Sequence, residues 1–331
     1  MIVFYFITLN CYKYNCSVKF GDINMIQFVK PGISIDFLGK KRFALLFSSI
    51  LILLSIGSIV IKGGLNYGID FAGGTMVQIW FKQGTTPDEV RKGLKEIGLE
   101  DSTIQQFGKK TDNEYLIRTE NTQSDVEGVS DKIQEVFREI YGEDGIDVRR
   151  VEMVGPQVGK ELRKKGLMAV VYAMVGILIY ITWRFEFRFA LGALAALLHD
   201  IIITIGIFSI TNKEFNLAIL AAILTIVGYS LNDTIVVYDR IRENLKKLLK
   251  KKLEPIVNAS INETLSRTIL TSGTTLFVVV ALFILGGGVI HDFAFALIVG
   301  IIIGTYSSIF IASPMLILWE EKFPSTKRKR L

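Results

Sequence analysis

Six long apolar segments constrain the fold of this 331-residue chain more than any other feature. A bilayer-spanning helix needs about 20 consecutive, mostly apolar residues, because its backbone polar groups can be satisfied only within the helix. Six segments meet this requirement: residues 43–61, 167–185, 188–210, 216–238, 268–289 and 293–319. Half of all residues are hydrophobic, which fits a membrane protein. We therefore expect a polytopic α-helical membrane protein with six transmembrane helices.

The net charge of +6 comes largely from basic residues that flank these segments. Most of them fall on one side of a six-span topology, namely Lys40–Arg42, Arg184, Arg188, Arg240, Arg242, the run 246–252 and Lys327–Arg330. The positive-inside rule then predicts that both termini lie in the cytoplasm. One basic cluster, Lys160 with Arg163–Lys165, falls on the opposite side. It follows a long translocated region, where the rule has little force.

The basic run at 246–252 is interpreted as an anchor on anionic membrane lipid, so no nucleic-acid partner is expected. Residues 241–256 are amphipathic and are predicted to lie on the membrane surface within a cytoplasmic loop, 239–264. The only cysteines, Cys11 and Cys16, are too few for a disulfide framework or a metal site. Residues 1–42 are predicted to form a cytoplasmic N-terminal segment. Met25 begins a more typical lead-in to the first span, so residues 1–24 are interpreted as a mis-called upstream start and are given no role.

Between the first two apolar segments, residues 62–154 alternate strand-like and helix-like patterns. Strands are expected at 75–81, 103–107, 114–119 and 146–154, and helices at 86–97 and 124–141. The order β-α-β-β-α-β predicts one ferredoxin-like α+β domain, external (periplasmic), between helices 1 and 2. It contains neither His nor Cys, which favours binding or docking over catalysis.

Asp233 is the most unusual residue of the apolar segments. It lies about 9 Å inside the charged boundary marked by Asp239 and Arg240. A carboxylate there costs about 2.5–3.5 kcal/mol and normally faces a partner or water. Arg267, near the start of the fifth span, could supply that partner, and the pair could either couple proton movement or merely fix helix packing. His199–Asp200 in the third span is a second polar spot, explained equally well by proton handling or by a helix–helix hydrogen bond.

Small residues of the sixth span, Gly300, Gly304 and Ser308, form a face suited to close helix packing. With the threonine stripe of span five, that face is expected to be uncovered in a lone chain, which predicts a partner of similar span count. No phosphate-binding Gly-x-x-x-x-Gly-Lys-[Ser/Thr] loop is present. Tyr238-Asp239 matches one motif of intramembrane aspartyl proteases, but their Gly-x-Gly-Asp motif is absent. No enzymatic activity, cofactor or metal is therefore expected.

Five motifs, in order along residues 37–320, resemble those of the SecF branch of the SecD/SecF protein-export family. They are Tyr67–Thr75, Val154–Gly159, Leu198–Asp200, Gly228–Asn244 and Leu265–Thr268. Their individual motif residues are Gly68, Asp70, Gly73, Gly74, Gly155, Pro156, Gly159, Asn232, Asp239 and Arg240. The SecD branch has a larger external region and a different glycine motif, so SecF is the better match.

The resemblance implies half of a transporter of the resistance-nodulation-division superfamily. It would work in the cytoplasmic (inner) membrane, with a SecD-like partner beside the SecYEG translocon, and use the proton-motive force in late steps of exporting precursor proteins. The family's intramembrane Asp and Arg correspond to Asp233 and Arg267, and His199 and Asp200 are further proton-coupling candidates. Two alternatives stay open: a small-solute or lipid transporter half of the same superfamily, and a passive structural subunit. The expected division is completed by a bundle at 155–319 and a basic cytoplasmic tail at 320–331.

Overall fold

The computed structural model describes residues 34–107, 112–119, 126–248 and 252–323. Six helices within these ranges are long and apolar enough to cross a membrane, which confirms the predicted number of spans. The interpretations of residues 1–24, of Cys11 and Cys16, and of the basic tail beyond residue 323 fall outside the described residues.

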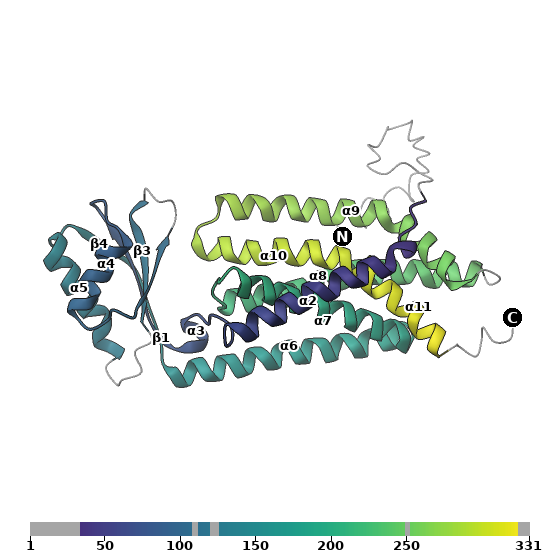
Figure 1. Cartoon of the computed structure of the whole chain (residues 1–331), viewed down its shortest axis with the longest axis horizontal. Coiled ribbons are helices and arrows are strands. Elements are labelled where there is room, and N and C mark those ends of the chain that lie inside the picture. Colours follow the sequence, from purple (N-terminus) through teal and green to yellow (C-terminus); the bar gives the residue numbers. More distant parts are fainter. Residues whose placement is uncertain (1–33, 108–111, 120–125, 249–251, 324–331) are drawn as a thin grey trace, which may run out of the picture. The chain divides into compact units, whose positions relative to one another are not determined.

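The sheet domain separates α2 from α6, and from α6 onward the helices of the bundle follow one another with short connections (Figure 1). They are η1 Leu38–Lys40, α2 Lys41–Ile61, α6 Pro156–Arg184, α7 Phe187–Ile210, α8 Leu217–Lys247, α9 Leu253–Leu285, α10 Gly288–Ser307, η3 Ser308–Ala312 and α11 Ser313–Lys322. A short helix, α3 Ile69–Ala72, precedes the sheet. The apolar segments predict the cores of the long helices well, and several of these helices extend beyond them.

Helices α8 and α9 extend into residues 239–264, the stretch predicted to be a cytoplasmic loop with a surface helix. Helix α8 continues to Lys247, and α9 begins at Leu253. The position of this stretch at the membrane surface stays a prediction. Some apolar side chains of this stretch are buried: Ile241 and Val257 are fully enclosed, and Ile256 is 1% exposed. Leu245 and Leu248, on the side that the sequence pattern assigned to the membrane surface, are half-buried. Packing within the protein therefore covers only part of the apolar surface of this stretch.

The sixth span is not a regular α-helix throughout. Residues Ser308–Ala312 form a π-helical turn between α10 and α11. The Ser313 hydroxyl donates to the Ser308 carbonyl at 3.0 Å, and Pro314 lies in the first turn of α11. Such turns place side chains in positions that a regular α-helix does not allow, and they often occur at functional sites.

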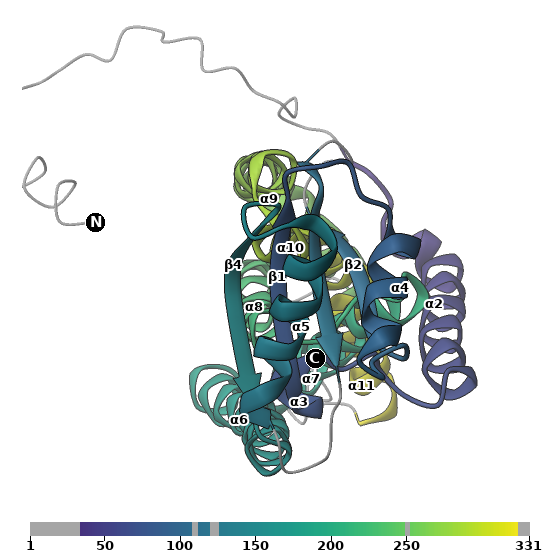
Figure 2. The ribbon, with the colours of Figure 1, turned by 90° about the vertical axis from the view of Figure 1, so that its left-hand side faces the viewer.

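The sheet domain contains β1 Gly74–Phe81, α4 Pro87–Glu96, β2 Thr103–Phe107, β3 Glu114–Thr119, α5 Val126–Tyr141 and β4 Ile146–Val154. The strand order is β2-β3-β1-β4 with all neighbours antiparallel, so the ferredoxin-like prediction is confirmed. In the central pair, Val77 lies opposite Ile117. Helices α4 and α5 cover one face of the sheet (Figure 2).

Apolar side chains at alternate positions of β1 account for this layer. Val77, Ile79 and Phe81 are fully buried and pack against the apolar sides of α4 and α5. The start of α4 is fixed by a capping box, as the sequence predicts: the Glu89 carboxylate accepts from the Thr86 backbone at 2.8 Å. This hydrogen bond, together with one from the Thr86 hydroxyl, lowers the pKa of Glu89.

Candidate functional site

Buried polar side chains of four helices form a set of neighbouring but separate hydrogen-bonded groups inside the bundle. In lipid, a polar group must find its partner within the protein, so such a network fixes how the helices meet. We call it the polar network; its members are His199 and Asp200 of α7, Ser230, Asp233 and Thr234 of α8, Ser272 of α9, Thr305 and Ser307 of α10, and Ser308 of η3. It has two carboxylate centres, at Asp200 and at Asp233.

The Asp200 centre is completely enclosed. Its Oδ1 lies 2.9 Å from Nδ1 of His199, and its Oδ2 accepts from Ser230 at 2.6 Å and from Ser307 at 2.8 Å. Asp200 is 1% exposed. The His199 ring also stacks on Tyr306, with ring centroids 6.1 Å apart. The centre thus joins α7, α8 and α10.

The Asp233 centre has fewer hydrogen bonds than the Asp200 centre. Within the described part of the chain, a single hydroxyl donates to its carboxylate: Ser272 of α9, at 2.9 Å from Oδ2. Thr305 of α10 in turn donates to the Ser272 oxygen, also at 2.9 Å. Next to Asp233, Thr234 lies 2.9 Å from the Ser308 hydroxyl, at the start of the π-helical turn. Asp233 is therefore buried, at 3% exposure, and its carboxylate accepts the last hydrogen bond of a short chain of hydroxyl groups.

The ion pair expected between Asp233 and Arg267 is not formed. Arg267 is exposed, although it lies within electrostatic reach of the carboxylate. Ser272 lies five positions after Arg267, and five steps of about 100° place the two side chains about 140° apart around α9. Because Ser272 faces Asp233, Arg267 points elsewhere. Asn232 of α8 is also exposed. The proton-coupling roles of Asp233, Arg267, His199 and Asp200 stay predictions.

The small-residue face of the sixth span is covered from within the chain, so the prediction that it is bare is wrong. A Cβ atom built on Gly304 would lie 2.9 Å from the Cβ of Ser230, and Gly300 faces Ile226 in the same way. Ser308 is fully buried. Helix α8 therefore occupies this face, because glycine lets the two backbones approach closely.

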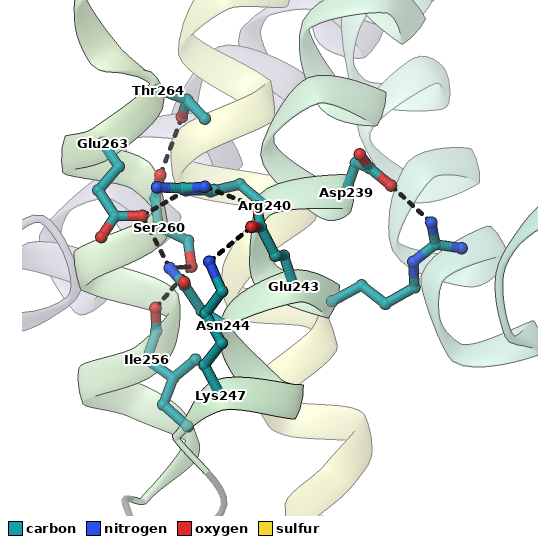
Figure 3. Close-up of polar contacts among 10 residues, drawn as sticks. Asp239, Arg240, Glu243, Asn244, Lys247, Ile256, Ser260, Glu263 and Thr264 are labelled. Carbon is teal, nitrogen blue, oxygen red and sulfur yellow. Dashed lines mark hydrogen bonds and ion pairs between the residues drawn. The ribbon is translucent and has the colours of Figure 1, made fainter.

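A second set of polar contacts fastens the ends of α8 and α9 away from the sheet domain (Figure 3). The Arg240 guanidinium contacts Glu263 at 2.5 Å and Glu243 at 2.6 Å. Asn244 donates to Ser260 at 3.0 Å and to Glu263 at 2.8 Å. The motif residue Asp239 pairs with Arg242 of the same helix at 2.7 Å. Arg240 thus belongs to a structural clasp between α8 and α9, whereas Asp239 pairs within α8 and lies 3.9 Å from Arg184 of α6. Both residues are separate from the polar network.

The glycine motif residues meet in a joint between the sheet domain and α6. Gly73 has a φ of +82°, which favours glycine, and a Cβ there would lie 2.8 Å from the Pro156 Cα. A Cβ on Gly159 would lie 3.0 Å from the Gly73 nitrogen. Gly74, also at positive φ, begins β1, and Gly155 precedes α6 as its N-cap residue. These motifs are therefore packing elements that let two backbone segments touch.

The remaining motif residues tie the sheet domain to the start of α8. The Gly68 amide donates to the Phe215 carbonyl at 3.0 Å, and the Asp70 carboxylate accepts from the Leu217 amide at 2.9 Å. Arg118 of β3 forms an ion pair with Glu214 beside this contact. Burial lowers the pKa of Arg118 to about 10, although neighbouring carboxylates, Asp292 first, act in the opposite direction. Asp70 thus caps the helix that carries Asp233.

Ser230, Ser272 and Ser307 of the polar network were missed in the sequence. They are small polar residues in apolar helices, where serine is common and tolerated. One signal was available: Ser230 precedes Asp233 by three residues, which places both near the same side of α8. Among the described residues, no group of three or more His, Cys, Asp or Glu is placed to hold a metal ion.

Fold and site together define a polytopic membrane protein with a buried, ionisable network and one external-type α+β domain. The family described as "Protein export membrane protein SecD/SecF, C-terminal" matches residues 132–322, and the "SecD/SecF GG Motif" matches residues 57–84. The chain is 50% identical to the protein translocase subunit SecF of Magnetococcus marinus over 297 residues, covering 89% of this chain and 94% of the relative. It is 49% identical to that of Desulfurispirillum indicum over 304 residues, covering 90% and 95%.

A crystal structure of SecDF from Thermus thermophilus, described as a translocon-associated membrane protein, superimposes with a TM-score of 0.79 at 38% identity. The match covers 88% of this chain and 39% of the SecDF chain, so this chain spans well under half of that relative. The chain belongs to the SecD/SecF family of protein-export membrane proteins. It is a multi-pass subunit of the Sec export machinery in the cytoplasmic membrane.

Proposed function

We propose that this subunit couples proton movement through the polar network to movement of the sheet domain during protein export. The observation that carries the proposal is the setting of Asp233: a buried carboxylate that one hydroxyl of a neighbouring helix holds. Binding a proton there removes a buried charge and changes what Ser272 and Arg267 interact with. Each charge that crosses the membrane provides about 2.3 kcal/mol per 100 mV, enough to bias a rearrangement of two helices.

Helix α8 supplies a direct mechanical link from Asp233 to the sheet domain. Its N-terminus is capped by Asp70, and Asp233 lies 16 residues further on, about 24 Å along the helix axis. A shift of α8 against α9 would therefore move the segment that holds the sheet domain, without passing through other spans. The joint of Gly73 with Pro156 gives α6 a second connection to the same domain.

The proposed orientation places the sheet domain outside the cytoplasm and both termini inside. The support is the distribution of basic residues, since Lys40, Arg184 and Arg240 all lie at the bundle end away from that domain. In this orientation, protons would reach Asp233 from the outside and leave toward the cytoplasm.

The proposed assembly pairs this subunit with a SecD-like partner beside the SecYEG translocon, where the two act on exported precursor proteins. Support comes from the exposed polar side chains in spanning helices, Asn232, Arg267 and Thr274. A charged side chain facing lipid costs about 2.5–3.5 kcal/mol, so we expect a partner protein to cover Arg267. A transport role without enzymatic activity fits a site built of carboxylates and hydroxyls that serves to move protons.

The test is precursor export into membrane vesicles that contain the full export machinery, with and without an imposed proton gradient. Asp233→Asn should insert and fold but export at the same rate with and without the gradient. Asp239→Asn is the matched control, because it makes the same change on the same helix outside the polar network, and it should respond as wild type does. A normal gradient response from Asp233→Asn would refute the proposed coupling.

The link through α8 is tested separately with Asp70→Ala. This variant keeps the polar network and loses one helix cap, at a cost of about 1 kcal/mol. Export should continue, with a gradient response reduced well below that of wild type. If the response stays complete while the Asp233→Asn response is lost, the coupling is right and the route through the α8 N-terminus is wrong.

A further inference from the structure

A deep apolar groove lies beside α6, at the end of the bundle that joins the sheet domain. It has a volume of about 580 Å³ and is bounded by α6, α7, α8 and the segment before β1. Its walls are apolar, with side chains that include Leu167, Val170, Ile205 and Ile223. We call it the α6 groove. Its volume lies within the range of ligand pockets, about 300–1,000 Å³.

Three basic side chains line one end of the α6 groove, and we call them the basic rim: Lys160, Arg163 and Lys164. All three are exposed. No ion pair among the described residues includes Lys160 or Lys164, whereas their neighbour Lys165 pairs with Glu161 at 2.8 Å. Arg163 stacks on the Tyr67 ring, 5.1 Å from its centroid, which holds its charge at the groove.

The basic rim is the one basic cluster that the positive-inside rule does not explain, since it lies on the side opposite to the others. From Arg163 to Val170, α6 descends about 10 Å toward the membrane core. The groove therefore offers positive charge at headgroup level and an apolar channel below it. That combination is complementary to an amphiphile with an anionic head and a hydrocarbon chain.

We propose that the α6 groove binds an anionic phospholipid of the leaflet at the sheet-domain end. Its phosphate would lie on Lys160, Arg163 and Lys164, and one acyl chain would lie against Leu167, Val170 and Ile223. Tyr67 and Phe71, which border the groove, belong to the segment that carries the glycine motif. A bound lipid would therefore touch the joint between the bundle and the sheet domain.

The experiment uses the full chain, purified and delipidated in a neutral detergent, with lipid binding measured by thermophoresis. The probes are dioctanoyl phosphatidylglycerol, which has a negative headgroup and acyl chains, dioctanoyl phosphatidylcholine, which has the chains without net charge, and glycerol 3-phosphate, which has the charge without chains. Phosphatidylglycerol should bind at least about tenfold more tightly than either other probe. Equal binding of the two lipids would mean that a neutral chain or a partner helix suits the groove as well. Equal binding of glycerol 3-phosphate would mean that the groove plays no part, so either result overturns the proposal.

Variants locate the site. Each basic side chain near an anionic headgroup is worth about fivefold in affinity, so Lys160→Gln with Lys164→Gln should weaken phosphatidylglycerol binding about 25-fold. Lys165→Gln, the same change one residue away and outside the groove, should leave it within about twofold. Val170→Trp should weaken the binding of both lipids because the larger side chain fills the groove. Met168→Trp, on another side of α6, should leave binding unchanged. Unchanged binding in the double lysine variant would rule out this groove as the site.

Discussion

Asp200 and Asp233 are both carboxylates buried in transmembrane helices, yet their surroundings differ sharply. Asp200 is held by an imidazole and two hydroxyl groups from three helices, and it is almost completely enclosed. Asp233 is held by the hydroxyl of Ser272, and the residue before it, Asn232, is exposed. A carboxylate with several fixed donors stabilises one packing of its helices, whereas one with few donors can change partners at lower cost. Because both acids are buried, we expect the number and origin of the hydrogen-bond donors, rather than burial, to distinguish a structural acid from a proton-coupling one.

The sharpest test of this difference compares the same substitution at the two centres. Asp233→Asn should lose the entire gradient-dependent part of export. Asp200→Asn should keep at least about half of it, because an amide can still accept from Ser230 and Ser307 and interact with His199. Export rates in vesicles with and without the gradient measure both. Should Asp200→Asn abolish the response and Asp233→Asn preserve it, the two roles would have to be exchanged.

Replacing each carboxylate with leucine should destabilise the protein more at Asp200 than at Asp233, which is the reverse of the order expected for the loss of export. Asp200→Leu leaves two hydroxyls and a ring nitrogen without their buried acceptor, which should cost about 3 kcal/mol of stability. Asp233→Leu leaves one hydroxyl, at about 1 kcal/mol. Thermal or denaturant unfolding of the full chain in mild detergent gives the difference. Equal losses at the two positions would contradict the assignment of Asp200 as the structural centre.

The hydroxyl donors provide a finer comparison. Ser272→Ala and Ser230→Ala should each cost about 0.6–1 kcal/mol of stability, because each removes one interhelical hydrogen bond. Only Ser272→Ala should also alter the gradient response, since Asp200 keeps Ser307 and His199 when Ser230 is lost. The two variants are compared in the same unfolding and export assays. A gradient response changed equally in both would show that the network acts as one unit.

Arg267 should have the smallest effect on the isolated chain. Because its side chain is exposed and has no ion pair with Asp233, Arg267→Gln should change stability by less than about 0.5 kcal/mol. Assembly should respond more strongly, since the exposed guanidinium belongs to the proposed partner face. Unfolding of the single chain and co-purification with a SecD-like partner measure the two effects. A loss of several kcal/mol of stability in the single Arg267→Gln chain would indicate a direct ion pair between Arg267 and Asp233.

The sequence alone determined the six spans, the ferredoxin-like domain and the identity of the intramembrane acids. Apolar segments of bilayer length admit few structures in lipid, and the order of strand and helix patterns between residues 62 and 154 fits one common topology. The Thr86 capping box is equally local, since all of its hydrogen bonds lie within four residues. The glycine motifs were visible too, although what they contact was not.

Only the tertiary structure decided which polar residues meet. Ser272 rather than Arg267 faces Asp233, because a few residues of offset along α9 turn a side chain to another side of the helix. Gly300 and Gly304 pack on α8 rather than on a partner, and Ile241 and Ile256, from the stretch predicted to lie on the membrane surface, are buried within the protein. An apolar or small-residue face in the sequence predicts that something will pack against it. What covers it depends on how helices distant along the chain pack together, which local spacing does not contain.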